Sequence, residues 1–170
     1  MHMTLTALNQ LPLPELREAL RRCCGAEAWV EGMCARFPVK DKQTLLGAAE
    51  EIWHSCTEAD WKEAFTHHPQ IGNLAALQQK FADTAQWAAG EQAAVAHAHT
   101  ATLQALAAGN QAYLEKFGYI FIVCATGRSA EEMLQLLTAR LPHSPREEIL
   151  IAMQEQARIT RIRLEKLLSI

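Results

Sequence analysis

The 170-residue chain has no long hydrophobic run and no strong excess of charge of either sign. Its apolar stretches stay well short of the roughly 20 residues that a helix needs to span a bilayer. The N-terminus lacks the basic segment followed by an apolar one that marks a secretion signal. The net charge is −3, and no Lys or Arg stripe is interleaved with aromatic residues. The chain therefore lacks the basic surface that is typical of nucleic-acid-binding proteins. We therefore expect a soluble, unsecreted protein that contacts neither membrane nor nucleic acid.

The chain also lacks a cysteine pattern that would indicate pairing. The chain has five cysteines, an odd number, and no C-x-x-C pair. Their spacing matches neither a disulfide framework nor a zinc site. A reducing compartment fits best, and we expect the protein to be cytoplasmic.

Two widespread enzyme motifs are absent as well. Gly118 and Gly127 do not form a G-x-G-x-x-G dinucleotide fingerprint, and no H-E-x-x-H occurs. His97 and His99 are two residues apart, so on a helix they would point to different faces rather than share a metal ion. A metal-dependent hydrolase therefore remains an alternative that would need ligands from other histidines, namely His54, His67, His68 or His143.

What the chain has in abundance is helical periodicity. Apolar residues recur at helical spacing in 14–24, 41–56 and 87–117. Gly118 follows the last of these, where a left-handed C-terminal cap is expected. Further helices are expected to begin after Thr57, Ser129 and Ser144, which precede acidic residues in the pattern of an N-terminal cap. Because 49% of the residues are hydrophobic, the chain can bury one sizeable core, but it is too short for two independent ones. We predict an all-α fold, a single-domain bundle of about seven to nine helices over residues 1–170, with no significant sheet.

Residues 119–124 are the one stretch whose β-branched and aromatic content suits a strand. No partner strand is evident. A lone strand would leave its backbone groups unpaired. The segment is therefore expected either to take a local helical turn or to offer its N–H and C=O groups to something else.

The stretch from Thr66 to Gly72 places two histidines beside a proline. Pro69 restricts the backbone both at itself and at His68. Histidine exchanges a proton near neutrality because its unperturbed pKa is about 6.5. The pattern favours His68, held at a helix end, as a candidate acid or base.

Three segments, taken together, resemble a known enzyme family. His68-Pro69-Gln70-Ile71-Gly72, Gly90-Glu91-Gln92-Ala93 and the run from Lys116 to Ala125 are similar to the signatures of 2-oxo-4-hydroxy-4-carboxy-5-ureidoimidazoline (OHCU) decarboxylase. That enzyme completes the conversion of urate to (S)-allantoin. Each motif alone is weak, whereas all of them in this order in a helical chain of this size are a strong signal.

The resemblance implies a cofactor-independent carboxy-lyase without a metal, acting on a small-molecule ureidoimidazoline. It implies His68 as the catalytic acid or base, and Glu91 as a catalytic group that orients His68 or moves a proton. It also implies a set of substrate-binding residues in which side chains hold the ring and ureido group and backbone amides bind oxygens. These residues are Pro69, Ala88, Glu91, Gln92, Phe121, Ile122, Val123, Cys124 and Ala125. Ala88 departs from the family, which usually has serine there, so a hydroxyl is missing.

Two further interpretations concern partners. The long amphipathic end helices suggest a homodimer, although such faces also pack within a chain. A helical protein-interaction module without catalysis is the main alternative, and it would use an exposed apolar patch and tolerate loss of His68. Arg161 and Arg163 on the last helix are expected to pair with acidic neighbours, and the alternative is that one of them reaches the substrate carboxylate.

Overall fold

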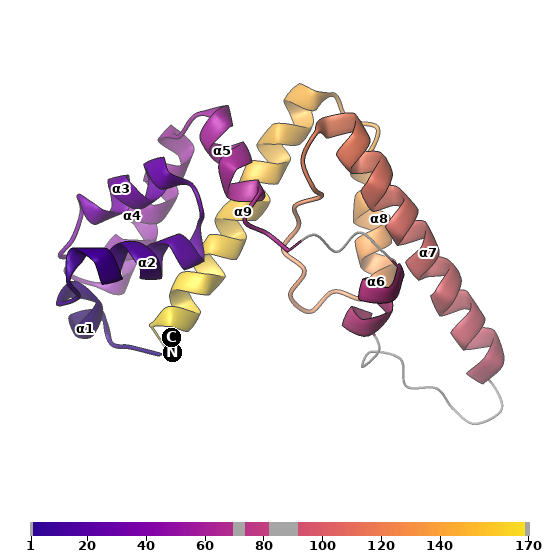
Figure 1. The fold of residues 1–170 in the computed structure, drawn as a ribbon, viewed down its shortest axis with the longest axis horizontal. Coiled ribbons are helices and arrows are strands. Elements are labelled where there is room, and N and C mark those ends of the chain that lie inside the picture. Colours follow the sequence, from indigo (N-terminus) through magenta and orange to yellow (C-terminus); the bar gives the residue numbers. More distant parts are fainter. Residues whose placement is uncertain (1, 70–73, 82–91, 169–170) are drawn as a thin grey trace. The chain divides into compact units, whose positions relative to one another are not determined.

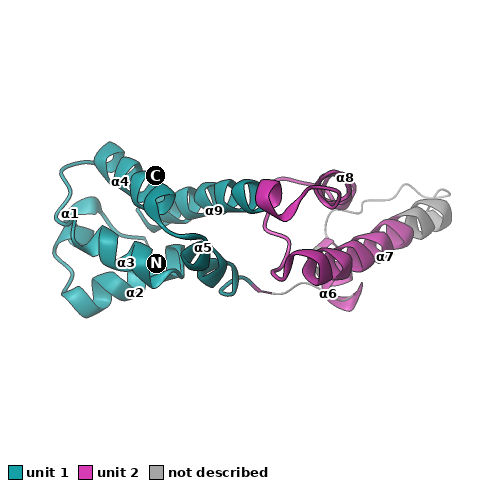
Figure 2. Cartoon of the chain, turned by 90° about the horizontal axis from the view of Figure 1, so that it is seen from above, with its two compact units in different colours: residues 1–68, 149–170 teal, residues 69–148 magenta. Residues whose placement is uncertain are grey.

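A computed structural model describes residues 2–69, 74–81 and 92–168. Over these residues the chain forms nine α-helices and no strand. Figure 1 shows the helices with their labels. The prediction of an all-α fold with seven to nine helices is thus confirmed. The chain divides into two compact units, residues 1–68 with 149–170 and residues 69–148, which are coloured separately in Figure 2.

Unit 1 contains the N-terminal helices and the greater part of the last one. Its helices are α1 (Leu5–Asn9), α2 (Leu13–Cys23), α3 (Glu27–Cys34), α4 (Lys42–Ser55), α5 (Glu58–Phe65) and α9 (Pro145–Leu167), of which the first turn belongs to unit 2. Met3 donates its backbone N–H to the Leu167 carbonyl at 2.9 Å. The beginning of the chain is therefore attached to the end of α9, where the N and C labels adjoin in Figure 1.

Tryptophan side chains join the helices of unit 1. Trp29 of α3 donates its indole N–H to the Ala49 carbonyl of α4 at 3.1 Å, and Trp53 of α4 donates to the Met153 carbonyl of α9 at 2.8 Å. The two indoles are 0% and 2% exposed. Each ring thus fills the core while its polar N–H remains satisfied. This contact network is what holds α9 against α4.

The helix ends follow the predicted caps closely. The Thr57 hydroxyl accepts from the Asp60 N–H, and the Asp60 carboxylate accepts from the Thr57 N–H, which completes a capping box at the start of α5. Ser129 caps α8 through the Glu132 N–H, and Ser144 caps α9 through the Glu147 N–H. Such a cap stabilises a helix by about 1 kcal/mol.

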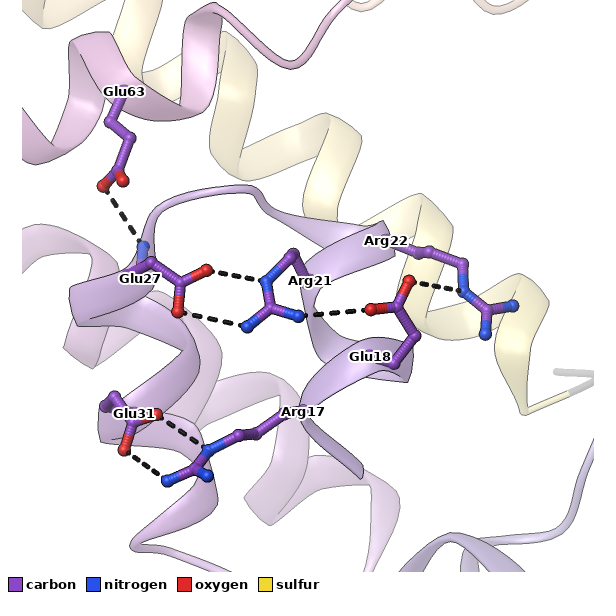
Figure 3. Close-up of polar contacts among 7 residues, drawn as sticks. All are labelled: Arg17, Glu18, Arg21, Arg22, Glu27, Glu31 and Glu63. Carbon is purple, nitrogen blue, oxygen red and sulfur yellow. Dashed lines mark hydrogen bonds and ion pairs between the residues drawn. The ribbon is translucent and has the colours of Figure 1, made fainter. Parts of the chain in front are cut away.

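Exposed ion pairs join α2 to α3, as Figure 3 shows. Arg17 pairs with Glu31 at 2.8 Å, and Arg21 lies between Glu27 at 2.6 Å and Glu18 at 3.1 Å. Each exposed pair contributes only about 0–1 kcal/mol. Their role is to hold α2 and α3 together on either side of the short connection around Gly25.

Unit 2 is built around the long helix α7 (Gln92–Phe117), against which α6 (Leu74–Phe81) and α8 (Ala130–Arg140) pack. A Cβ on Gly109 of α7 would lie 2.6 Å from Leu137 of α8, so glycine permits this close approach. Helix α7 ends as predicted, with Gly118 at φ +81° and its N–H bonded to the Leu114 carbonyl at 2.9 Å. Glycine adopts this left-handed conformation without a Cβ clash.

Residues 119–125, between α7 and α8, take neither helical nor strand conformation. Of the two expectations for this segment, the helical turn is wrong. Its backbone groups must therefore be satisfied by other parts of unit 2 or be open to a ligand.

Candidate functional site

His68 lies just beyond the end of α5. Its backbone N–H donates to the Phe65 carbonyl at 3.3 Å, which continues the turn of the helix for one more step. The imidazole is half-buried, whereas the neighbouring His67 and Pro69 are exposed. The structure thus distinguishes the two histidines, and His68 is the one whose ring enters the fold of unit 1.

The His68 ring is held by Gln156 of α9. Its Nε2 is hydrogen-bonded to the Gln156 Oε1, and the Gln156 Nε2 donates to the Thr160 hydroxyl at 3.1 Å. Gln156 is 1% exposed and Thr160 is 5% exposed. Gln156 is not among the site residues predicted from the sequence, although its place among apolar positions of the last helix is a visible signal.

The surroundings of His68 favour its neutral form. Burial lowers the pKa of its imidazole below the ordinary value, the hydrogen bond to Gln156 opposes that shift, and the positive charge of Arg163 adds to it. Arg163 is itself held by a hydrogen bond from its Nη1 to the Cys23 carbonyl at 3.3 Å. A neutral imidazole near neutrality can accept a proton, which is the first requirement of a general base.

His67, unlike His68, packs against the backbone of a glycine. A Cβ placed on Gly25, in the connection between α2 and α3, would overlap the His67 ring. The exposed His67 ring therefore packs directly on the Gly25 backbone. This contact ties the end of α5 to the loop that the ion pairs of Figure 3 brace.

In unit 2, a buried arginine fixes the segment 121–125. Arg140 donates from Nη1 to the Ile122 carbonyl at 2.7 Å and from Nε to both oxygens of Glu148, at 2.7 and 3.0 Å. Its guanidinium also lies 4.5 Å from the centre of the Phe121 ring. Since Arg140 and Glu148 are both buried, each depends on the other for compensation of its charge.

The backbone C=O and N–H groups of this segment differ in their hydrogen bonding. The Cys124 carbonyl accepts from the Arg128 Nε at 3.0 Å and the Ala125 carbonyl from the Arg128 N–H at 3.1 Å. Within the described part of the chain, no group accepts a hydrogen bond from the backbone N–H of Phe121, Ile122, Val123 or Ala125. The segment thus presents backbone donors, which suit the oxygens of an anionic ligand.

A cavity of about 320 Å³ lies between α4 and α9, lined by Leu46, Trp53, Thr160 and others. His68 is not among its lining residues. Its two arginines, Arg158 and Arg161, pair with Glu155 and Glu165 of their own helix, at 2.8 and 2.9 Å. The cavity therefore shares Thr160 with the His68 network but supplies no cation free of a carboxylate partner.

Two predicted site residues, Ala88 and Glu91, lie outside the described residues, and Gln92 is described only as the first residue of α7. Within the described ranges, no three His, Cys, Asp or Glu side chains gather in a way that could hold a metal ion. Nor does any helix in those ranges have the length and apolar character needed to cross a membrane.

Comparisons with known proteins agree on one family. The family model for OHCU decarboxylase matches residues 9–165. The uric acid degradation bifunctional protein TTL of Arabidopsis thaliana is 38% identical over 148 residues, which cover 86% of this chain and 45% of that protein. The OHCU decarboxylase of Amia calva is 36% identical over 59 residues, 35% of this chain and 34% of that protein.

Two solved structures are similar in fold. The crystal structure of an OHCU decarboxylase in the presence of (S)-allantoin has a TM-score of 0.70 and 36% identity, covering 88% of this chain and 96% of that one. The crystal structure of an (S)-allantoin synthase has a TM-score of 0.72, covering 98% of this chain and 54% of that one. Its 18% identity supports the fold alone.

Over the described residues the chain is thus an all-α protein with a half-buried, hydrogen-bonded histidine just beyond the end of α5. Since the family model spans nearly all of it, the chain belongs to the OHCU decarboxylase family. The chain spans less than half the length of the curated relatives it matches, 45% in the plant protein. The resemblance recognised from the three motifs is confirmed.

Proposed function

We propose that this protein is a carboxy-lyase that decarboxylates OHCU to (S)-allantoin in the degradation of urate. Membership of the family and 36% identity to a decarboxylase crystallised in the presence of (S)-allantoin support this substrate and product. The observation that carries the proposal is the His68 imidazole, half-buried, kept neutral by its surroundings and oriented by Gln156.

The reaction needs proton transfers but no external electron carrier. In OHCU one ring carbon bears both the carboxylate and a hydroxyl. When its bond to the carboxylate breaks and carbon dioxide leaves, the electron pair moves into the adjacent ring carbon–nitrogen double bond, whose nitrogen takes up a proton. The hydroxyl then loses its proton to become a carbonyl, and the carbon bearing the ureido group gains one. Many decarboxylases use a cofactor as electron sink, whereas this substrate supplies its own.

His68 is assigned the acid–base role in these transfers. As a neutral imidazole it accepts the proton of the substrate hydroxyl and returns one to carbon from a fixed side, which sets the (S) configuration. Pro69, exposed beside it, is assigned to the lining of the same pocket. General acid–base catalysis of this kind contributes about 10²–10⁴-fold in rate.

The remaining assignments divide between backbone and side chains. The backbone N–H groups of the segment 121–125 bind substrate oxygens, an assignment that the Arg140 bond to the Ile122 carbonyl supports because it holds the segment in place. Glu91 and Gln92 hold the ring and the ureido group by analogy with the family motif. Ala88 adds only van der Waals contact, since it lacks the usual hydroxyl.

We also propose that residues 1–170 act as one decarboxylase domain, because the family match of 9–165 includes both compact units. A homodimer in the cytoplasm is proposed as its state. The reducing compartment is inferred from the odd number and the spacing of the five cysteines. Leu13 and Leu150 are 47% and 49% exposed and are candidates for the dimer contact; light scattering coupled to gel filtration tests this.

The decisive experiment supplies the protein with freshly made products of urate oxidation and follows optical activity as (S)-allantoin appears. We expect a rate well above the spontaneous one. His68→Ala should lower turnover by about 10²–10⁴-fold while leaving the circular dichroism of the helices unchanged. His54→Ala, which removes an exposed histidine of α4, is the matched control and should keep full turnover. Turnover of His68→Ala near that of the control would remove His68 from the mechanism.

A second variant tests the motif that lies outside the described residues. Glu91→Ala should raise KM and lower kcat, because the carboxylate is assigned both to binding and to proton transfer. Unchanged kinetics would return Glu91 to the ordinary role of an acidic residue near a helix start, where it complements the helix dipole.

A further inference from the structure

Gln156 is a polar side chain where the packing of α9 calls for an apolar one. Ala152, Met153 and Leu164 of the same helix are buried core residues, and Gln156 is 1% exposed among them. Burying an amide costs free energy unless its donors and acceptors are paired. A buried glutamine on the face of a core helix therefore calls for a specific partner, and that partner is His68.

The two hydrogen bonds of the Gln156 side chain fix the orientation of its amide. Its Nε2 donates to the Thr160 hydroxyl, one helical turn further along α9, at 3.1 Å. The amide oxygen is thereby turned toward His68, where it accepts from the ring Nε2. An amide oxygen can only accept, so the hydrogen of the neutral imidazole must reside on Nε2, and Nδ1 is left with its lone pair.

We propose that Gln156 is a positioning residue that selects the Nε2–H tautomer of His68, so that Nδ1 is the atom that exchanges protons with the substrate. Thr160 contributes by accepting a hydrogen bond from the Gln156 amide, which holds the amide in the required orientation. The inference rests on the proposed function for the role of Nδ1, but the tautomer itself is a property of the unliganded protein.

The other charged and titratable groups near His68 do not fix its tautomer. Arg163 and His67 act on the imidazole only through their charge. Arg163 is bonded to the Cys23 carbonyl, and the ring of His67 rests on Gly25. Of the hydrogen bonds within the described residues, the one that His68 donates to Gln156 is the contact that can tell one ring nitrogen from the other.

The first test is nuclear magnetic resonance of the protein with ¹⁵N-labelled histidine, which reads the tautomer directly from the shifts of the two ring nitrogens. The wild type is expected to show His68 as the Nε2–H form above its pKa. Gln156→Met keeps the volume and removes the hydrogen bond, so His68 should become a mixture of both tautomers. Gln154→Met, an exposed position two residues away on α9, is the control and should leave the wild-type pattern unchanged.

The second test is kinetic. Gln156→Met should lower kcat by about 10- to 100-fold, the range seen when a partner that orients a functional histidine is removed, with a smaller change in KM. Gln156→Glu restores an acceptor but adds a negative charge, which favours the imidazolium form. It should therefore recover much of the rate at high pH and move the acidic limb of the pH–rate profile to higher pH. A purely structural glutamine would give neither the recovery nor the shift.

The outcomes separate this inference from the proposed function. A wild-type protein in the Nδ1–H form, or a Gln156→Met variant that retains a pure Nε2–H signal, would overturn the role of Gln156 whatever the enzyme does. Absence of decarboxylase activity in the wild type would overturn the proposed function, and the resonance measurement would still decide whether Gln156 sets the tautomer.

Discussion

Arg140 and Glu148 form a buried salt bridge in unit 2, with the Arg140 Nε 2.7 Å from the Glu148 Oε1 and side-chain exposures of 7% and 0%. The same guanidinium reaches the Ile122 carbonyl, and it lies 5.9 Å from the centre of the Tyr113 ring. One buried cation thus connects α7, the segment 121–125, α8 and the start of α9. Because the guanidinium and its partners come from four parts of the chain, the pair specifies how the segment 121–125 is placed.

Removing one member of this pair is expected to destabilise the protein strongly. Glu148→Gln leaves the buried guanidinium without a counter-charge, and such a loss costs about 3–5 kcal/mol. Urea unfolding followed by circular dichroism measures it. The control is Arg161→Met, which breaks the pair with Glu165 at 2.9 Å and 59% and 30% exposure and should cost about 0–1 kcal/mol. Equal losses in the two variants would contradict a special role for Arg140.

Local sequence signals predicted those features that depend on neighbouring residues. The caps at Thr57 and Ser129 and the glycine end of α7 at Gly118 each need only a few residues in the right order. The short helices α1, α3 and α6, of 5, 8 and 8 residues, were missed. Helix α3 has no side-chain cap at Ala26, so it depends on the core contact of Trp29 and gives no local signal.

The candidate site was predictable only in part for the same reason. The His68-Pro69 turn is a local pattern, whereas the environment of its ring comes from Gln156, 88 residues away. Likewise the composition of residues 119–124 suggested a strand, but its carbonyl partner Arg140 comes from a different helix. Contacts between residues that are far apart in the chain leave little signal in the sequence. Here the signal is a polar residue at a core position of α9.

Cys23 and Cys24 should be unreactive in the folded protein. Burial raises the pKa of the Cys23 thiol to about 11 and that of the Cys24 thiol to about 12, and only the thiolate reacts readily. We expect iodoacetamide to leave both unmodified in the native protein at mildly alkaline pH and to modify all five cysteines in concentrated urea, as measured by peptide mass spectrometry. Modification of Cys24 in the native protein at the rate found in urea would show that its thiol is not buried in the native fold.

His68 should make the protein less stable in acid. Burial lowers its pKa in the folded state, while the unfolded chain has the ordinary value of about 6.5. Between the two values the unfolded state binds more protons, so stability falls as the pH drops below about 6.5. The free energy of unfolding of the wild type minus that of His68→Gln should therefore decrease between about pH 7.5 and about pH 5.5. A difference that stays constant, or grows in acid, would mean that His68 is not desolvated.

The contact of Gly25 with His67 gives the last prediction. Gly25→Ala would place a methyl group against the near end of the His67 side chain, including its Cβ, so the ring cannot simply swing away. Overpacking of this kind costs about 1–3 kcal/mol. Gly47→Ala is the matched control, because nothing lies within 4 Å of its Cβ in the middle of α4, and there alanine should stabilise by about 0.5–1 kcal/mol. If the clash is with the ring, adding His67→Ala to Gly25→Ala should recover part of the loss in urea unfolding, since most of the overlapping atoms are then gone. Strict additivity of the two substitutions would place the cost of Gly25→Ala in the backbone of the α2–α3 connection, and the exposed imidazole would then have no part in holding the end of α5 and, with it, His68.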